Sequence, residues 1–203
     1  MNILLLVPLN TLPEQDARLV ELQAAFAQAC NALAPIVQST RVWNRVALHH
    51  MAYKQLREQF PAMGSQMVCN AIYSVSRHSR TFFQNPASPF NLAKLGDKPL
   101  PLLRFSDTCP VYFDRHTLSL KNGQLSMYTL DGRMRFQLDL KAQDEANFHE
   151  KKLREIVLSR RLGGGFDLQF TFSDGEEEDN SPAADNAGEL PEYVIVEETN
   201  ANA

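Results

Sequence analysis

The chain lacks several features that would place it in a class at once. Its three cysteines, Cys30, Cys69 and Cys109, are widely spaced and form no CxxC pair, which argues against a disulfide framework and favours a reducing compartment. No apolar run approaches the roughly 20 residues that span a bilayer. The opening MNILLLVPLN has no basic residue ahead of it and no small-residue cleavage site, so it predicts a first strand rather than a signal peptide. We therefore expect a cytoplasmic globular protein without a membrane segment.

Familiar catalytic and metal-binding motifs are absent too. His49 and His50 are neighbours, so on a helix they would point about 100° apart and could not hold one metal ion. The sequence has no HExxH motif and no Cys-His cluster, which makes a zinc site a poor prediction. Gly163-Gly164-Gly165 lacks the Lys and the Ser or Thr of a phosphate-binding loop. We therefore predict no catalytic residue, no metal site and no cofactor.

Basic residues are missing from the last part of the chain. The last 29 residues, from Gly175, hold nine Asp and Glu but no Lys or Arg. Since the whole chain has 24 acidic and 20 basic residues, residues 1–174 carry 15 acids against 20 bases, a net charge of +5. A mildly basic body permits nucleic-acid binding without requiring it. Residues 175–203 have the composition of a disordered acidic tail, with a possible short strand at residues 193–196.

What the chain does contain, in its first half, is helical periodicity. Residues 14–38 place apolar side chains at three- and four-residue spacings, which predicts a helix that Pro35 ends or kinks. A second helix is expected over residues 40–60, stopped by Pro61. A third is expected over residues 66–83, with Ser65 as its N-cap.

From Lys98 onward the period changes to two. Three segments alternate apolar and polar residues around Asn122-Gly123 and Asp131-Gly132, and both dipeptides are hairpin-turn signals. Residues 145–161 are expected to form a short charged helix that ends at the three glycines. The pattern predicts an α+β fold. In it, residues 1–12 and 97–174 form a small antiparallel barrel, residues 13–96 a three-helix insert, and residues 175–203 the tail.

The second and third helices interleave cationic, aromatic and amide side chains at helical spacing. The predicted nucleic-acid-binding residues are Arg45, His49, Tyr53, Arg57, Gln66, Asn70, Tyr73, Arg77 and Arg80. Arg offers forked donors to phosphate, Tyr a stacking plane, and Gln or Asn paired groups for base edges. The opposite faces are expected to pack in the core: Val42, Val46, Met51, Leu56 and Phe60 on the second helix, and Met67, Ala71, Ile72, Val75 and Phe82 on the third.

Two ordinary interpretations stand beside this one. The stripes are also consistent with solvated helix faces whose tyrosines lie partly in the core. Further along the chain, a second set of cations would either extend a basic track or be ordinary surface charges: Arg104, Arg115, Arg133, Arg135, Lys151, Lys152, Arg160 and Arg161.

The run HHMAYKQLREQFPAMGSQMVCNAIYSVSR resembles the N-terminal region of the TnpB family, transposon-encoded RNA-guided DNA endonucleases related to compact type V CRISPR effectors. The matching positions are His49, Tyr53, Leu56-Arg57, Phe60-Pro61, Ser65-Gln66 and Asn70-Ala71. The resemblance covers roughly residues 1–174. It implies a wedge-like barrel with a helical recognition insert, which together grip guide RNA and target DNA. The family's RuvC-like nuclease domain and zinc ribbon have no counterpart here, although Glu197 lies near where the first nuclease strand would carry an Asp.

The sequence and the resemblance together predict a non-catalytic, transposase-associated protein that binds RNA, DNA or both, with a nuclease subunit in trans as a possible partner and no membrane. Two alternatives remain. One is a protein-interaction module whose acidic tail docks on a partner through residues 190–196 as an added strand. The other is a degenerate fragment without retained activity.

Overall fold

The computed structural model describes residues 2–174 and 189–198, which form a mixed α+β fold with antiparallel sheets. The chain divides into two compact units. Unit 1 comprises the described parts of residues 1–23 and 110–183, and unit 2 those of residues 24–109 and 184–203. None of the described helices combines the length and the apolar content that a bilayer crossing needs.

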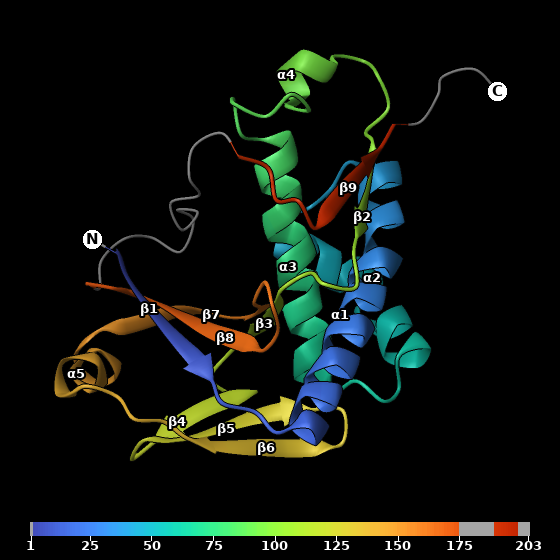
Figure 1. Cartoon of the computed structure of the whole chain (residues 1–203). Coiled ribbons are helices and arrows are strands. Elements are labelled where there is room, and N and C mark those ends of the chain that lie inside the picture. Colours follow the sequence, from blue (N-terminus) through green and yellow to red (C-terminus); the bar gives the residue numbers. More distant parts are fainter. Residues whose placement is uncertain (1, 175–188, 199–203) are drawn as a thin grey trace. The chain divides into compact units, whose positions relative to one another are not determined.

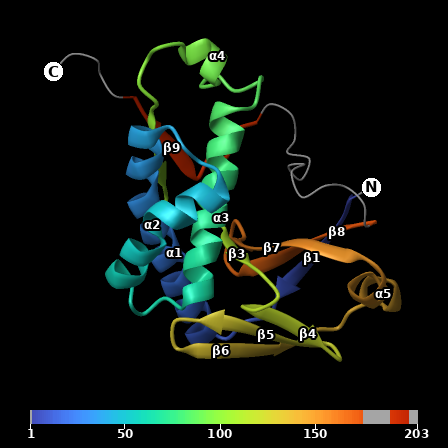
Figure 2. The same cartoon turned by 180° about the vertical axis from the view of Figure 1, so that it is seen from behind.

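Two antiparallel sheets make up most of unit 1 (Figure 1). One has the strand order β1–β8–β7–β3 and the other β4–β5–β6. In both views of the ribbon the four-stranded sheet lies above the three-stranded sheet (Figures 1 and 2). The strand bounds are β1 Asn2–Leu9, β3 Val111–Phe113, β4 Leu118–Lys121, β5 Gln124–Thr129, β6 Gly132–Gln137, β7 Lys152–Arg160 and β8 Phe166–Ser173.

Strand β8 supplies the aromatic core of unit 1. Its alternate residues Phe166, Leu168, Phe170 and Phe172 are buried, as the two-residue period of a strand requires when one face is covered. Helix α5 (Ala142–Glu150) adds Phe148, whose ring meets Phe170 and Phe172 edge-on at centroid distances of 5.0 and 4.9 Å. Edge-to-face packing of this kind adds to the stability that burial alone gives.

Both predicted hairpin turns are present. Lys121 pairs with Gln124 across Asn122-Gly123, whose φ angles of 52° and 72° are those of a tight turn with two left-handed residues. In the second hairpin Thr129 pairs with Gly132, so that turn is centred on Leu130-Asp131, one residue earlier than predicted.

Unit 2 is built mainly from helices. It holds the larger part of α1 (Pro13–Thr40), together with α2 (Arg45–Gln59), α3 (Ser65–Phe83) and α4 (Leu92–Leu95). A two-stranded antiparallel sheet joins β2 (Leu102–Phe105) to β9 (Val194–Glu197). The strand expected at residues 193–196 is therefore confirmed with a shift of one residue. Of the predicted tail, residues 175–188 and 199–203 lie outside the described residues.

The helix boundaries agree only in part with the predicted ones. Helix α1, predicted over residues 14–38, does not end at Pro35 but continues to Thr40, because Leu33, Ala34 and Val37 are buried around the proline and their packing offsets the missing backbone hydrogen bond. The second helix begins at Arg45 rather than residue 40, since Arg41 takes a positive φ of 55° and Asn44 caps the new helix. The third helix has Gly64, not Ser65, at its N-cap position.

The largest error concerns residues 145–161. Only Ala142–Glu150 is helical, and Lys152–Arg160 form strand β7 between β3 and β8. The three glycines, all with positive φ, join β7 to β8 rather than ending a helix. The predicted barrel is not found either: the strands of residues 2–174 and 189–198 form three separate sheets, none of which closes.

Candidate nucleic-acid interface

Helices α2 and α3 form a hairpin whose ends are fixed by side chains. Asn44 Oδ1 accepts hydrogen bonds from the backbone N–H groups of Val46 and Ala47, at 3.0 and 3.2 Å, which starts α2. At the other end, Arg57 Nη1 donates to the carbonyl oxygen of Met63 at 2.7 Å. Arg57 thus fastens the connection between the helices, and part of its guanidinium is already used within the protein.

The cationic and aromatic stripe of α2 lies beside its buried face. The buried residues are Leu48, Ala52 and Leu56, four apart. Each stripe residue from His49 to Arg57 follows one of them, a step of about 100° around the helix. His49, Tyr53 and Arg57 are accordingly half-buried, whereas Arg45 at the start of the helix is exposed.

Ring contacts link the stripe to α3. The guanidinium carbon of Arg45 lies 5.8 Å from the ring centroid of Tyr73, within cation–π range. His49 and Tyr53 are stacked, with centroids 4.5 Å apart and planes 16° apart. The hairpin thus places four of the predicted residues in two contacting pairs, Arg45 with Tyr73 between the helices and His49 with Tyr53 along α2.

Helix α3 is buried on most sides, which limits what its polar residues offer. The five residues expected to pack, Met67, Ala71, Ile72, Val75 and Phe82, are all buried as predicted. Gln66, Tyr73, Arg77 and Arg80 are half-buried. Asn70, by contrast, is only 7% exposed, and its Nδ2 lies 3.4 Å from Met67 Sδ. In this conformation the Asn70 amide is not on the surface that a ligand would meet.

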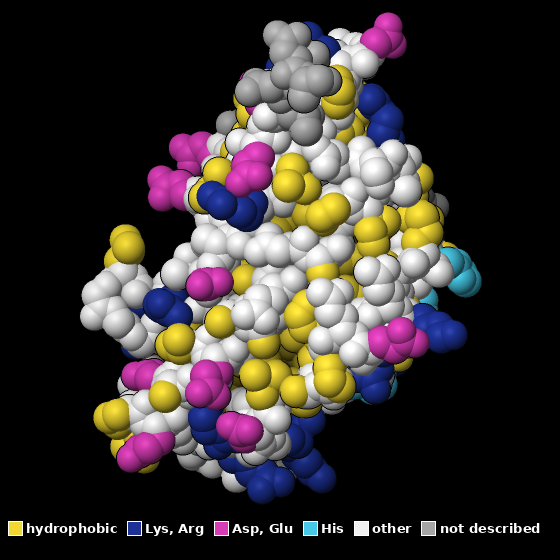
Figure 3. Space-filling view, turned by 90° about the vertical axis from the view of Figure 1, so that its right-hand side faces the viewer, with side chains coloured by type: hydrophobic (Ala, Val, Ile, Leu, Met, Phe, Trp, Pro, Cys, Tyr) yellow, Lys and Arg dark blue, Asp and Glu magenta, His cyan; other side chains and the backbone are white. Residues whose placement is uncertain are grey.

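The outer face of α2 differs from the prediction. Val46 and Met51, expected in the core, are 60% and 42% exposed, because the core face follows Leu48, Ala52 and Leu56 instead. His50 and Lys54 are exposed on the same helix. Figure 3 shows His side chains next to Lys and Arg side chains toward the right-hand side of the view. The exposed side of α2 therefore mixes apolar and basic groups, a mixture that the sequence pattern did not predict.

Four of the eight cations in the second predicted set are paired with other groups of the protein. Arg133 Nε donates to Ser126 Oγ at 2.8 Å and its Nη2 to the Ser126 carbonyl at 3.0 Å. Ion pairs join Arg161 to Asp167 at 2.7 Å and Lys151 to Asp174, and Arg104 pairs with Glu197 in unit 2 at 3.2 Å. These contacts favour the ordinary surface-charge interpretation for Arg104, Arg133, Lys151 and Arg161. Arg115, Arg135, Lys152 and Arg160 are exposed.

One buried polar contact of unit 2 could not be foreseen from the sequence. His78 Nε2 lies 2.7 Å from the hydroxyl oxygen of Tyr193, and its Nδ1 lies 2.7 Å from the Ser74 carbonyl oxygen. The His78 ring also meets Phe105 and Tyr193 edge-on. No local pattern connects residues so distant in the chain.

Two thiols of unit 2 are poor nucleophiles. Burial raises the pKa of Cys30 well above its usual value, and the neighbouring Cys109 adds to the effect. Burial, with a smaller contribution from Asp107, raises the pKa of Cys109 to about 12. Because only the thiolate is reactive, neither side chain suits nucleophilic catalysis.

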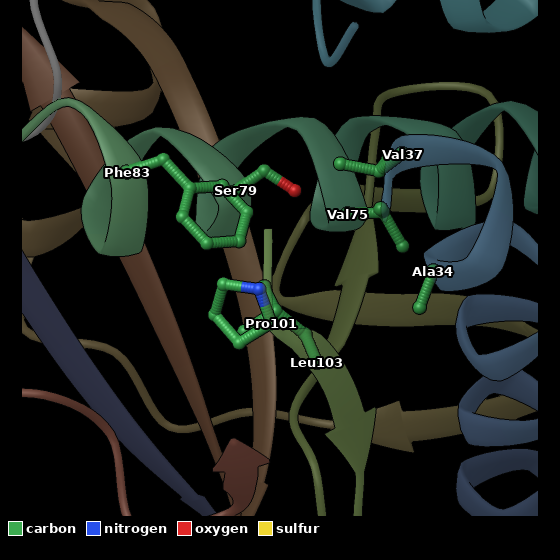
Figure 4. Close-up of a pocket in the computed structure, with 7 residues that line it drawn as sticks. All are labelled: Ala34, Val37, Val75, Ser79, Phe83, Pro101 and Leu103. Atoms are coloured by element: carbon green, nitrogen blue, oxygen red, sulfur yellow. The ribbon is translucent and has the colours of Figure 1, made fainter. Parts of the chain in front are cut away.

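A small hollow in unit 2 is apolar apart from one hydroxyl group. Ser79 and six apolar side chains of α1, α3 and residues 101–103 line the same small space (Figure 4). Ser79 is fully buried, and its Oγ has no hydrogen-bond partner among the described residues. The hollow has no room for even a water molecule, so it is a packing feature and not a ligand pocket.

Within residues 2–174 and 189–198, no group of three or more His, Cys, Asp or Glu side chains is placed to hold a metal ion. No protein-family model matches the chain. No curated protein is significantly similar to it.

Proposed function

We propose that the chain binds RNA or DNA through the α2–α3 face, defined by Arg45, His49, Tyr53, Tyr73, Arg77 and Arg80. The observations that support this most directly are two contacts, that of Arg45 over Tyr73 and the stacking of His49 on Tyr53. Cations with flat rings on one surface suit a nucleic-acid strand, because phosphates meet the cations and bases stack on the rings.

The residues of this face would have different roles, and two further residues of α2 and α3, Arg57 and Gln66, would assist them. Arg45 is exposed and Arg80 half-buried, and each would neutralise a phosphate. Tyr53 and His49 would offer a stacking edge to an unpaired base, and Gln66, at the start of α3, a paired donor and acceptor. Arg57 would act indirectly, because its hydrogen bond to Met63 holds the hairpin that positions the others.

In its fuller form the proposal follows the resemblance to the TnpB family. The chain would be the recognition half of an RNA-guided nuclease, with the small sheets in the place of the wedge-like barrel. It would bind guide RNA, target DNA or both, without cutting either by itself. A nuclease subunit acting in trans would then supply the chemistry.

The test is the salt dependence of binding to single strands of RNA and DNA with the same sequence. Arg45→Ala combined with Arg80→Ala should weaken binding and reduce the slope of log K against log salt by about 0.7 for each phosphate that is no longer neutralised. A matched double variant, Lys121→Ala with Lys141→Ala, removes two exposed cations of unit 1 and should leave the slope almost unchanged.

The possible outcomes test the location of the site and the nucleic-acid-binding function separately. Equal slope changes in both double variants would mean that binding follows total charge, and the α2–α3 face would be the wrong site. No measurable binding of the unaltered chain to either strand, even at low salt, would reject the nucleic-acid function itself. A preference for the RNA strand over the DNA strand would identify the guide rather than the target as the principal ligand.

A further inference from the structure

Residues 189–198 dock on a strand that is distant in the sequence. Strand β9 pairs antiparallel with β2 from Leu102 opposite Glu197 to Phe105 opposite Val194. Figure 1 shows the two strands side by side. Among the described residues, β9 and β2 pair with no other strand. The segment is therefore held along one strand edge, as a peptide is held when it adds a strand to a receptor protein.

Tyr193 anchors the start of this segment. Its carbonyl oxygen accepts a hydrogen bond of 2.9 Å from the backbone N–H of Ser106, just beyond β2. Its hydroxyl oxygen lies 2.7 Å from Nε2 of His78 on α3, and the two rings meet edge-on at a centroid distance of 5.4 Å. A buried imidazole as the partner of the hydroxyl makes tyrosine the best fit at this position, because phenylalanine would leave that nitrogen without this contact.

The exposure and contacts of residues 194–197 indicate which side chains fit along β2. Val194 is only 6% exposed, opposite the buried Phe105, whereas Ile195 is 45% exposed. Glu197 Oε1 then lies 3.2 Å from Arg104 Nη1. The selected pattern is a tyrosine, a buried aliphatic residue directly after it, and a carboxylate three positions further on.

We propose that β2 and α3 form a peptide-binding site, that residues 189–198 are its resident ligand, and that an extended segment of another protein with the same side-chain pattern takes their place when they leave. The docked segment contributes one strand pairing, one buried aliphatic residue, one tyrosine contact and one exposed ion pair. So few contacts give modest affinity to a free peptide, and attachment to the same chain keeps the resident segment in place through its high effective concentration. The site shares helix α3 with the proposed nucleic-acid face but uses a different residue of it, the buried His78.

The experiment uses substitutions to displace residues 189–198 from the site in the full chain, and then adds the same residues as a free peptide. Val194→Asp places a charge at the buried position and should empty the site, and Tyr193→Ala is a milder second variant. The probe is a fluorescent peptide of sequence ELPEYVIVEE, residues 189–198. It should bind both variants at least about tenfold more tightly than the unaltered chain, whose own segment competes, since an attached ligand acts at about millimolar concentration.

Two altered peptides test the pattern. A peptide with Tyr193→Phe should bind the Val194→Asp chain about five- to tenfold more weakly, because it cannot form the hydrogen bond to His78. A peptide with Glu192→Gln should bind as well as the parent, because Glu192 is exposed and makes no ion pair among the described residues. Equal binding of the parent and Phe peptides would overturn the assignment of the site.

Three further results would reject the proposal. The first is equally weak binding of the parent peptide to the unaltered and variant chains. The second is binding of a scrambled peptide with the same affinity as the parent. The third is unfolding of both variants, measured by circular dichroism, which would make residues 189–198 an integral part of the unit 2 core rather than an exchangeable ligand.

Discussion

His78 and Tyr193, which lie on α3 and just before β9, are joined by a contact of 2.7 Å between Nε2 and the hydroxyl oxygen. His78 is buried, and its other ring nitrogen lies 2.7 Å from the carbonyl oxygen of Ser74. Both imidazole nitrogens thus have partners, one from its own helix and one from the far end of the chain. A buried polar side chain satisfied in this way fixes the position of both partners.

Removing the Tyr193 hydroxyl should lower the stability of unit 2. Tyr193→Phe keeps the ring but leaves the buried Nε2 without this partner, and we expect the free energy of unfolding to fall by about 1–2 kcal/mol. Urea unfolding followed by circular dichroism measures it. Tyr53→Phe is the matched control, because Tyr53 is half-buried and its ring keeps the stack on His49. An equal fall in both variants would contradict the role given to His78.

Two buried serines of α3 should respond in opposite directions to replacement by alanine. Ser79 Oγ is buried without a hydrogen-bond partner in the described part of the chain, whereas Ser74 Oγ lies 3.3 Å from His78 Nδ1. Helix propensity favours alanine equally at both sites, so the difference between the variants reports the hydroxyl groups alone. Ser79→Ala should stabilise the protein by about 1 kcal/mol, and Ser74→Ala should destabilise it by a similar amount. Thermal and urea unfolding of both variants check the sign, and destabilisation by Ser79→Ala would show that its hydroxyl has a partner after all.

Local conformation was the predictable part of this fold. The Asn122-Gly123 turn depends only on two residues that tolerate positive φ, and the apolar face of α3 follows from spacing alone. Strand β7 was mistaken for a helix because its state is decided by β3 and β8, its partners in the sheet. The charged residues of β7 do not indicate that these strands will be its partners. Pairing between distant segments is where a single sequence says least.

Two features of position 123, its positive φ and its close neighbouring atoms, should each make glycine the favoured residue there. It has a φ of 72°, and an added Cβ would lie 2.9 Å from Gln137 Nε2 and 3.2 Å from the Leu138 carbonyl oxygen. Gly123→Ala should therefore cost about 1 kcal/mol for backbone strain and about 1 kcal/mol more for the close contacts, about 2 kcal/mol in all. Urea unfolding measures the sum, and a cost of only about 1 kcal/mol would show that Gln137 and Leu138 adjust to the added Cβ without cost.

Stability should fall at high pH because of the buried thiols. The folded state raises the pKa of Cys109 from 9.0 to about 12, so the folded protein keeps a proton that the unfolded chain releases first. The stabilisation is complete below pH 9 and disappears as the pH rises toward 12, at no more than about 1.4 kcal/mol per pH unit for one thiol. Cys109→Ala should flatten this decline in urea unfolding between pH 8 and 10.5. An unchanged decline would assign it to other groups.

The sequence predicted which residues of the candidate site share a helix face, but not how exposed each side chain is. Four-residue spacing correctly put His49, Tyr53 and Arg57 in one stripe, and the Arg45 contact with Tyr73 joins it to α3. How far each side chain reaches solvent depends on which neighbours cover the helix. Asn70 therefore turned out buried and Val46 exposed, since a helical pattern fixes a face but not what covers it.

Stacking and charge on the α2–α3 face should be separable by experiment. Tyr53→Leu removes a stacking surface but no charge, so single-strand affinity should fall by about 1–2 kcal/mol while the salt slope stays constant. Arg45→Gln removes a charge, so the slope should fall by about 0.7. Fluorescence anisotropy over a series of salt concentrations measures both quantities, with Tyr53→Phe as the control that keeps the ring. If Tyr53→Leu bound as tightly as Tyr53→Phe, no base would stack at this position, and the face would act only as a patch of positive charge.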